Sequence, residues 1–181
     1  MYQQAVRIRG IIEDMLTLST LESGDRAQER QFIDLSALLG SLQEEGEMLS
    51  GERRHRIVVD CQPGFSLYAN PEEVHSAFSN LVSNAVRYTP AGGAINIRWY
   101  ADKEGAHFEV QDTGIGVEPR HLSRLTERFY RVDKARSRNM GGTGLGLAIV
   151  KHIAQAHDGH VAVESKLGEG SRFSIHLPQH K

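Results

Sequence analysis

Cysteine is almost absent from this sequence, and Cys61 is the only one among 181 residues. A single thiol excludes an internal disulfide and a thiolate metal cluster, and it is typical of proteins from a reducing compartment. No apolar run approaches the roughly 20 residues that cross a bilayer. The N-terminus also lacks the basic, apolar and small-residue order of a signal peptide. We therefore expect a cytoplasmic chain that makes no direct membrane contact.

The sequence also lacks a strong excess of charge of either sign. The 21 Lys and Arg residues nearly balance the 23 Asp and Glu residues, which leaves a formal net charge of -2. Nucleic acid is therefore not an expected partner, because nucleic-acid-binding domains carry a basic face. The composition, 39% hydrophobic and 24% charged, supports a packed core. The length suffices for one domain and a short extra element, since domains run to about 100 to 200 residues.

The first two dozen residues predict one amphipathic helix, from Tyr2 to about Leu21. Its apolar residues recur at spacings of three and four, with no proline among them. They are Ala5, Ile8, Ile12 and Met15, flanked by Ile11, Leu16 and Leu18. Glycine and polar residues from Glu22 to Asp25 predict its end. The stripe needs a partner, and two alternatives are open. The helix either folds back on the globular part or belongs to a helical bundle or dimer.

Beyond Gly24 the pattern is mixed. Strands are predicted at 31–33, 56–61, 66–68, 94–100, 106–111, 160–164 and 172–177, with a hairpin turn at 102–105. Helices are predicted at 35–49, 71–88 and 145–156, with Asp34 and Asn70 as N-caps. A short helix at 119–127 interrupts the long stretch from Thr113 to Thr143, and a loop of that length is a functional lid or disordered. We expect an α+β fold, a two-layer α/β sandwich with helices on one sheet.

Two asparagines form the first chemical motif. Asn80 and Asn84 are four residues apart, so they share one helix face, and Arg87 and Tyr88 follow one turn later. Neutral oxygen donors of this kind can hold a Mg²⁺ ion whose other ligands are phosphates and water. The alternative is an ordinary polar helix surface.

Two glycine-rich segments follow. Directly after a predicted strand come Asp112, Gly114 and Gly116. Glycine there lets the backbone approach a ligand closely, and the carboxylate can accept a hydrogen bond from an exocyclic amine. A plain turn is the alternative. The run 141–148 leads straight into a helix and offers free backbone N–H groups to an anion such as phosphate. It is neither a Walker loop nor a dinucleotide-binding fingerprint.

The segment between the two glycine-rich runs is basic, and we call it the lid. Its cations are Arg128, Arg131, Lys134, Arg136 and Arg138, and they lie beside Phe129 and Tyr130. A segment that closes over a polyphosphate explains both its charge and its length. A solvated basic loop is the alternative.

In their order and spacing, these four segments resemble the N, G1, F and G2 boxes of the catalytic domain of bacterial sensor histidine kinases. That resemblance implies a Bergerat-type (GHKL) ATP-binding fold. The run 124–137 is similar to the branch of the family that includes the phosphate-regulon sensors. The family pattern assigns residues 1–23 to the second helix of a dimerisation and phosphoacceptor hairpin, 24–30 to a linker, and 31–181 to the catalytic ATP-binding domain.

The resemblance also implies individual roles. Asn84 would be the main Mg²⁺ ligand, assisted by Asn80, and Arg87 would contact phosphate where many relatives carry Lys. Tyr88 would pack on the adenine, and Asp112 would accept a hydrogen bond from the amino group of the adenine. Gly114 and Gly116 would shape the base pocket. The residues that would line the phosphates are Gly142, Thr143, Gly144, Leu145 and Gly146, and those that would position the lid are Phe129, Arg131 and Arg136. The expected catalytic set is Asn80, Asn84, Arg87 and Arg131.

The implied activity is transfer of the γ-phosphoryl group of Mg-ATP to a histidine. None of the nine histidines fits the family's phosphoacceptor pattern, so the acceptor is expected on a helical hairpin outside this chain. The implied partners are that hairpin, within a homodimer, and a response regulator of a two-component system. The parent protein is expected to be anchored in the cytoplasmic membrane.

Three different functions remain open. ATPases of the gyrase, Hsp90 and MutL group share the fold but use a Glu one turn before the Mg²⁺-binding Asn, where this chain has Asn80. An amide cannot act as a general base, which favours phosphoryl transfer over hydrolysis. The second function is that of a serine-directed kinase of the anti-sigma type, and the third is that of a nucleotide-binding module without turnover.

Overall fold

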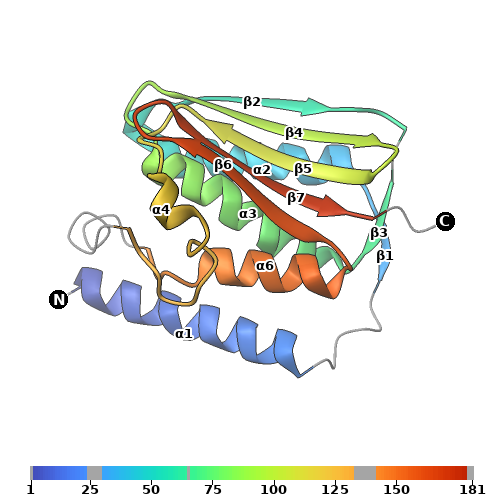
Figure 1. Ribbon diagram of the computed structural model, residues 1–181, viewed down its shortest axis with the longest axis horizontal. Helices are drawn as coiled ribbons and strands as arrows, with labels where there is room; N and C mark the ends of the chain where they lie inside the picture. The colour runs from blue at the N-terminus through green and yellow to red at the C-terminus, as the bar shows by residue number, and fades with distance from the viewer. Residues whose placement is uncertain (1, 24–29, 65, 133–141, 179–181) are drawn as a thin grey trace.

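The structure is a computed structural model that describes residues 2–23, 30–64, 66–132 and 142–178. Figure 1 shows a sheet as one layer and helices α2, α3 and α6 as the second, with α1 beyond α6 on the side away from the sheet. The helices are α1 (Tyr2–Glu22), α2 (Leu35–Ser50), α3 (Pro71–Tyr88), α4 (Pro119–Leu122) and α6 (Gly146–Ala156). The strands are β1 (Gln31–Ile33), β2 (Arg56–Cys61), β3 (Leu67–Ala69), β4 (Ala94–Asp102), β5 (Gly105–Asp112), β6 (His160–Lys166) and β7 (Gly170–Leu177).

Five of the described strands form the main sheet, in the order β2-β4-β5-β7-β6. β2 runs parallel to β4, and the other neighbours are antiparallel. The two-layer sandwich predicted from the sequence is therefore confirmed. Strands β1 and β3 do not join this sheet. They pair with each other, and the rings of Phe32 and Tyr68 lie 5.1 Å apart across the pair.

The core fills the space between the sheet and the helices. Along β4 the side chains of Ile95, Ile97 and Trp99 are fully buried, as strand alternation requires. On α3 the ring of Phe78 stacks on Phe108 of β5 at 3.7 Å. Each such buried side chain stabilises the fold by about 1.5–3 kcal/mol. Packing of this kind fixes α3 against the sheet, and α3 carries the predicted asparagine motif.

The opposite face of the sheet carries a row of alternating charges that crosses all five strands. Its members, in strand order, are Asp60, Arg98, Glu109, Arg172 and Glu164. Glu109 is the central one, only 5% exposed, and its two oxygens face Arg98 at 3.7 Å and Arg172 at 3.8 Å. An antiparallel sheet with one face on the core can keep its other face polar in this way.

Local signals in the sequence set several element boundaries correctly. The side chain of Asp34 accepts from the N–H of Ala37, and Asn70 accepts from Glu72 and Glu73, so both predicted N-caps are confirmed. The hairpin between β4 and β5 is tighter than predicted, because the strands extend to Asp102 and Gly105, which pair with each other.

The helix predicted at 119–127 is shorter than expected. α4 ends at Leu122, and the chain continues in turns in which Arg124 donates to His121 at 3.0 Å and Glu127 donates to Arg124 at 2.9 Å. Pro119 starts the helix, but the following segment must turn toward Gly144, to which Phe129 is bonded. That tertiary contact, rather than local propensity, ends the helix.

Helix α1 folds back on the globular part, which is one of the two alternatives left open by its sequence. Leu18 is 4% exposed and joins the core, and Ile11 and Leu21 pack beside it. Much of the predicted apolar stripe points the other way, since Ile8 and Ile12 are 58% and 52% exposed. Met15 and Leu16 are also exposed. No helix in the described ranges combines the length and the apolar character that crossing a membrane would need.

Candidate functional site

The asparagine motif lies on the side of α3 that the core leaves uncovered. Residues Ala77, Phe78, Leu81 and Ala85 bury the opposite face, while Asn80, Asn84, Arg87 and Tyr88 are each partly exposed. The amide nitrogen of Asn80 donates to the carbonyl oxygen of Ser76 at 2.8 Å, so its Oδ1 remains an acceptor. A Cβ atom at position 146 would collide with that Oδ1 unless the Asn80 side chain moved, so glycine lets α6 begin close to this amide.

Asp112 ends β5 and is only 6% exposed. Burial raises the pKa of its carboxyl, while hydrogen bonds from the backbone of Gly114 and Ser171 act in the opposite direction. The N–H of Gly114 donates to its Oδ1 at 2.8 Å. A Cβ at position 114 would lie 2.5 Å from that oxygen and 2.6 Å from the carbonyl oxygen of Tyr88. Glycine is therefore required where this turn meets the end of α3.

The turn after Asp112 is held between α3 and the β6–β7 hairpin. Ile115 donates to the carbonyl of Tyr88 at 3.1 Å and accepts from Gly168 at 2.8 Å. Gly116 has a φ of +67°, and a Cβ there would lie 2.0 Å from the carbonyl oxygen of Lys166. These contacts hold the turn at residues 112–116 in place from two sides, which suits a pocket that must keep a fixed shape.

The second glycine-rich run lies beside two guanidinium groups. A Cβ at Gly142 would lie 3.1 Å from Nη1 of Arg87 and 3.6 Å from Nη2 of Arg131. Gly146 thus faces Asn80, and Gly142 faces Arg87 and Arg131, so the glycine-rich run lies beside side chains from α3 and from the lid. Positive charge beside a helix N-terminus favours an anion there.

The described part of the lid is ordered by its own contacts. The N–H of Phe129 donates to the carbonyl oxygen of Gly144 at 2.8 Å, and the Phe129 side chain is 54% exposed. His121 bonds the hydroxyl of Tyr130 at 2.5 Å, and the guanidinium of Arg124 lies 4.2 Å from the centre of the Tyr130 ring. Residue Arg136, predicted to position the lid, lies outside the described residues, as do Lys134, Arg138 and Gly141.

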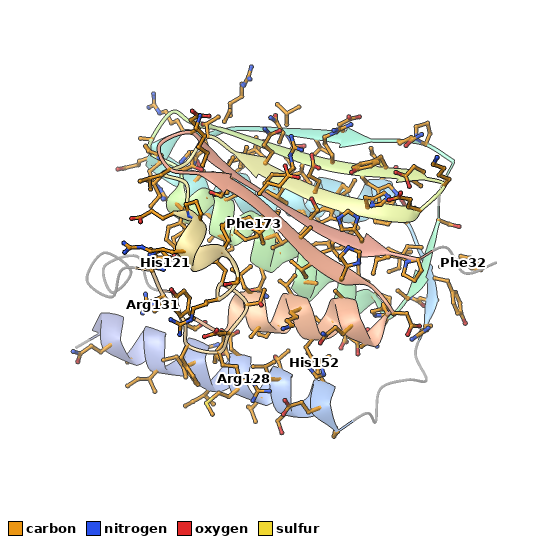
Figure 2. All side chains as sticks on the ribbon, viewed as in Figure 1. Phe32, His121, Arg128, Arg131, His152 and Phe173 are labelled. Atoms are coloured by element: carbon orange, nitrogen blue, oxygen red, sulfur yellow. The ribbon has the colours of Figure 1, made fainter. Side chains whose placement is uncertain are left out.

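Arg128 does not face the glycine-rich turn, in contrast to the lid hypothesis. Its guanidinium forms an ion pair with Glu22 at the end of α1. Figure 2 shows Arg128 beside α1. Part of the lid's charge thus serves the contact between the globular part and α1.

Sequence reasoning missed Asp14. The hydroxyl of Thr143 donates to Oδ2 of Asp14 at 2.6 Å, and the same hydroxyl accepts from the N–H of Leu145 at 3.2 Å. The signal was present, because Ile11, Asp14, Leu18 and Leu21 follow one another at spacings of three and four. A carboxylate inside such a stripe indicates a polar contact with the element that the stripe covers.

The donor chemistry of the site suits a hard cation bound together with phosphate. In the described ranges no group of three or more His, Cys, Asp or Glu residues could hold a metal ion. The oxygen that the protein itself offers is the Oδ1 of Asn80, and Asn84 lies one turn farther along α3. Amide oxygens, phosphates and waters are ligands that Mg²⁺ accepts.

Comparison with known families decides what kind of domain this is. The sequence profile of the family described as "Histidine kinase-, DNA gyrase B-, and HSP90-like ATPase" matches residues 69–181. The chain belongs to this family. Its expected Bergerat-type (GHKL) fold is therefore correct, and the matched range covers all four motifs.

Among members of this family, the curated relatives are sensor kinases. The chain is 51% identical over 177 residues to the phosphate regulon sensor protein PhoR of Pseudomonas aeruginosa, a match that covers 98% of this chain and 40% of that protein. It is 37% identical to PhoR of Haemophilus influenzae, covering 99% of this chain and 42% of that protein. The chain therefore spans about two-fifths of the length of these relatives.

Solved structures of histidine kinases share the fold. Full-length ShkA in complex with AMPPNP superposes with a TM-score of 0.80 at 29% identity, over 93% of this chain and 35% of that chain. The mycobacterial sensor histidine kinase MprB gives a TM-score of 0.71 at 25% identity, over 83% of this chain and 97% of that chain. ATP binding is thus a property of the family and of its fold.

Proposed function

We propose that this chain is the catalytic part of a sensor histidine kinase that binds Mg-ATP and transfers the γ-phosphoryl group to a histidine of a helical hairpin. The phosphoryl group would then pass to a response regulator in a two-component system, in a phosphate response. The observation that carries the proposal is the placement of Asn80, Arg87 and Arg131 along the glycine-rich run 142–146 that leads into α6. The similarity to two PhoR proteins supports the signalling role.

At the base end, Asp112 is suited to accept the amino group of adenine. Its Oδ1 is already bonded to Gly114 inside a buried turn, and a buried carboxylate gains most from a further donor. Gly114 and Gly116 hold the turn close to α3 and the β6–β7 hairpin. Tyr88, at the end of α3, would pack on the base.

At the phosphate end, the residues would position the triphosphate and neutralise its charge. Asn84 and Asn80 would hold Mg²⁺, and the ion would supply positive charge that stabilises the phosphate groups. Arg87 and Arg131 would contact the phosphates beside Gly142, and the N–H groups of residues 142–146 would bond their oxygens. Positioning and charge stabilisation are the main contributions that a protein makes to phosphoryl transfer.

The nucleophile would come from another segment. The acceptor imidazole would attack the γ-phosphorus in line, with ADP as the leaving group. The domain would have to move relative to the hairpin to reach it, and the expected hinge at 24–30 lies, apart from Arg30, outside the described residues. The same proposal includes a homodimeric parent protein anchored in the cytoplasmic membrane.

Hydrolysis is the second candidate, and the geometry at Asn80 argues against it. This residue stands where the family's ATPases carry their general base, and its amide nitrogen is bonded to Ser76. An amide does not take a proton from water at neutral pH.

One assay separates these functions. The chain is incubated with Mg²⁺, γ-labelled ATP and a separately purified hairpin that carries an acceptor histidine, and label on protein and free phosphate are followed together. Labelled hairpin that disappears in Asn84→Ala supports the kinase. Free phosphate without labelled hairpin favours the ATPase, and ATP binding without either product favours a binding module.

A further inference from the structure

A carboxylate of α1 reaches the turn where the phosphates are expected. Asp14 accepts the hydroxyl of Thr143 at 2.6 Å, and Thr143 in turn accepts the N–H of Leu145 directly before α6. Gly10, one turn earlier on α1, lies beside the same residue, since a Cβ there would be in ordinary contact with the methyl carbon of Thr143 at 3.6 Å. Asp14 is therefore connected by two hydrogen bonds, through the hydroxyl of Thr143, to the N-terminal end of α6, where an anion is favoured.

Asp14 also lies within the field of the predicted phosphate ligands. Burial raises the pKa of its carboxyl, and the negative charge of Glu13 acts in the same direction, whereas the Thr143 hydroxyl and the positive charge of Arg87 act to lower it. Arg87 and Arg131 both approach Gly142, the residue before Thr143. The negative charge of Asp14 thus occupies surroundings that the structure arranges for a polyphosphate.

Two further contacts hold α1 in this position. Leu18, one turn after Asp14, is 4% exposed and packs into the core. Glu22 forms an ion pair with Arg128 of the lid. Thr143 and Arg128, which form polar contacts with α1, both belong to segments predicted to close over ATP. A movement of those segments would therefore change the contacts that hold α1.

We propose that Asp14 acts as an internal anion that competes with the phosphates of ATP, so that docking of α1 and binding of nucleotide oppose each other. This inference rests on the proposed function and adds a regulatory role for α1. ATP would displace the carboxylate and release the domain from α1, and by linkage a docked α1 weakens ATP binding by the same factor. The exposed side chains of Ile8, Ile12, Met15 and Leu16 remain available to other helices in the docked state.

A matched pair of charge removals tests the competition. Asp14→Asn keeps the size of the side chain and removes its charge, and Glu13→Gln removes the neighbouring charge, which pairs with Arg9 on the exposed side. We expect Asp14→Asn to lower the Kd for Mg-ATP, measured by calorimetry, by about fivefold or more, the lower end of typical coupling. Glu13→Gln should stay within about twofold of wild type, as expected for an exposed pair.

The outcomes separate this inference from the proposed function. Equal Kd values for Asp14→Asn and Glu13→Gln, in a wild-type chain that binds ATP, would overturn the competition and leave the kinase proposal standing. Absence of ATP binding in all three proteins would overturn both. Binding that appears only in Asp14→Asn would support both.

A distance measurement keeps the inference testable even if Asp14→Asn folds poorly. Spin labels at Ser19→Cys on α1 and Glu104→Cys on the β4–β5 hairpin, in a Cys61→Ser background, report the separation of α1 from the sheet. We expect the distance distribution of the wild-type sequence to lengthen when Mg-ATP is added. An unchanged distribution at saturating ATP would contradict the release of α1.

Discussion

The backbone N–H of Phe129 donates to the carbonyl oxygen of Gly144 at 2.8 Å, and both residues have positive φ values, 61° and 79°. This bond joins the lid to the glycine-rich turn before α6, although 15 positions separate the two residues along the chain. A non-glycine residue pays a conformational cost in the left-handed region, so the Phe129 conformation persists because the surroundings impose it.

Gly144→Ala is expected to disturb this junction. The new Cβ would lie 3.0 Å from the Cα of Phe129, in a backbone conformation that costs an L-residue about 1–2 kcal/mol. We predict a lower thermal midpoint and a weaker affinity for ATP. Gly92→Ala is the matched control, because Gly92 has a similar φ of +77° and nothing within 4 Å of its Cβ position. If both variants lost stability but bound ATP equally well, the junction would have no role in nucleotide binding.

Asp112→Asn should weaken ATP binding by about 10- to 100-fold, the range expected when a buried polar group loses its partner. The amide would retain one oxygen for the N–H of Gly114 and present a nitrogen donor toward the amino group of adenine. Asp60→Asn is the control, because its side chain is 68% exposed at the far end of the charge row. Titration of both variants with an ATP analogue measures their affinities. Equal affinities would mean that Asp112 does not contact the base.

Affinity for ATP should also fall on acidification. Burial raises the pKa of Asp112, so this carboxyl takes up a proton at a higher pH than an ordinary Asp, whose pKa is about 3.9. The sign for stability is opposite, because a folded state with the raised pKa binds the proton more tightly than the unfolded chain and gains stability as pH falls. Binding curves and melting curves measured over the same acidic range should show these opposite trends, and Asp112→Asn should remove both contributions.

The pair formed by His157 and Glu73 should make stability depend on pH near neutrality. Burial lowers the pKa of His157, and Glu73, whose Oε2 lies 3.1 Å from Nε2, acts in the opposite direction. A lowered folded-state pKa means that the unfolded chain binds the extra proton first, so stability is lost as pH falls below the ordinary value of about 6.5. His157→Gln should reduce the dependence of the free energy of unfolding on pH between about pH 7 and pH 5.5, measured by denaturant titration at several pH values, and an unchanged dependence would contradict this role of His157.

Asn80→Glu is expected to convert part of the activity into hydrolysis. The substitution places a carboxylate where ATPases of the family carry their general base, and such a base contributes about 10²- to 10⁴-fold. Release of free phosphate from Mg-ATP should rise at least about tenfold, and the double variant with Asn84→Ala should release none. Unchanged turnover would mean that position 80 does not decide between transfer and hydrolysis.

Much of the fold follows from local signals. Asn70 and Pro71 define the start of α3 to the residue, because capping depends on neighbours along the chain. The four motifs likewise required only their order and spacing. Local patterns do not predict which of two similar apolar faces of a helix packs against the rest of the domain. Both faces of α1 carry apolar residues, and the face with Leu18 is selected by contacts with α6, the lid and the glycine-rich turn.

The same limit explains two contacts that the sequence does not predict. Strands of three residues such as β1 carry too little pattern to choose a sheet, so the pairing of β1 with β3 depends on how α2 and α3 place them. The contact between Asp14 and Thr143 joins residues 129 positions apart, and no spacing rule predicts it. The sequence does contain the residues of the site, but their connection to α1 is a property of the tertiary structure.

The row of charges from Asp60 to Glu164 bears on which face of the domain can contact other molecules. Each carboxylate and guanidinium in the row already has an opposite charge beside it, so its three carboxylates and two guanidinium groups leave little unpaired charge for a neighbouring molecule. We therefore expect the domain to make few specific contacts through this face. The specificity of its contacts is thereby left to the opposite side, where α6, the glycine-rich turn and the lid lie.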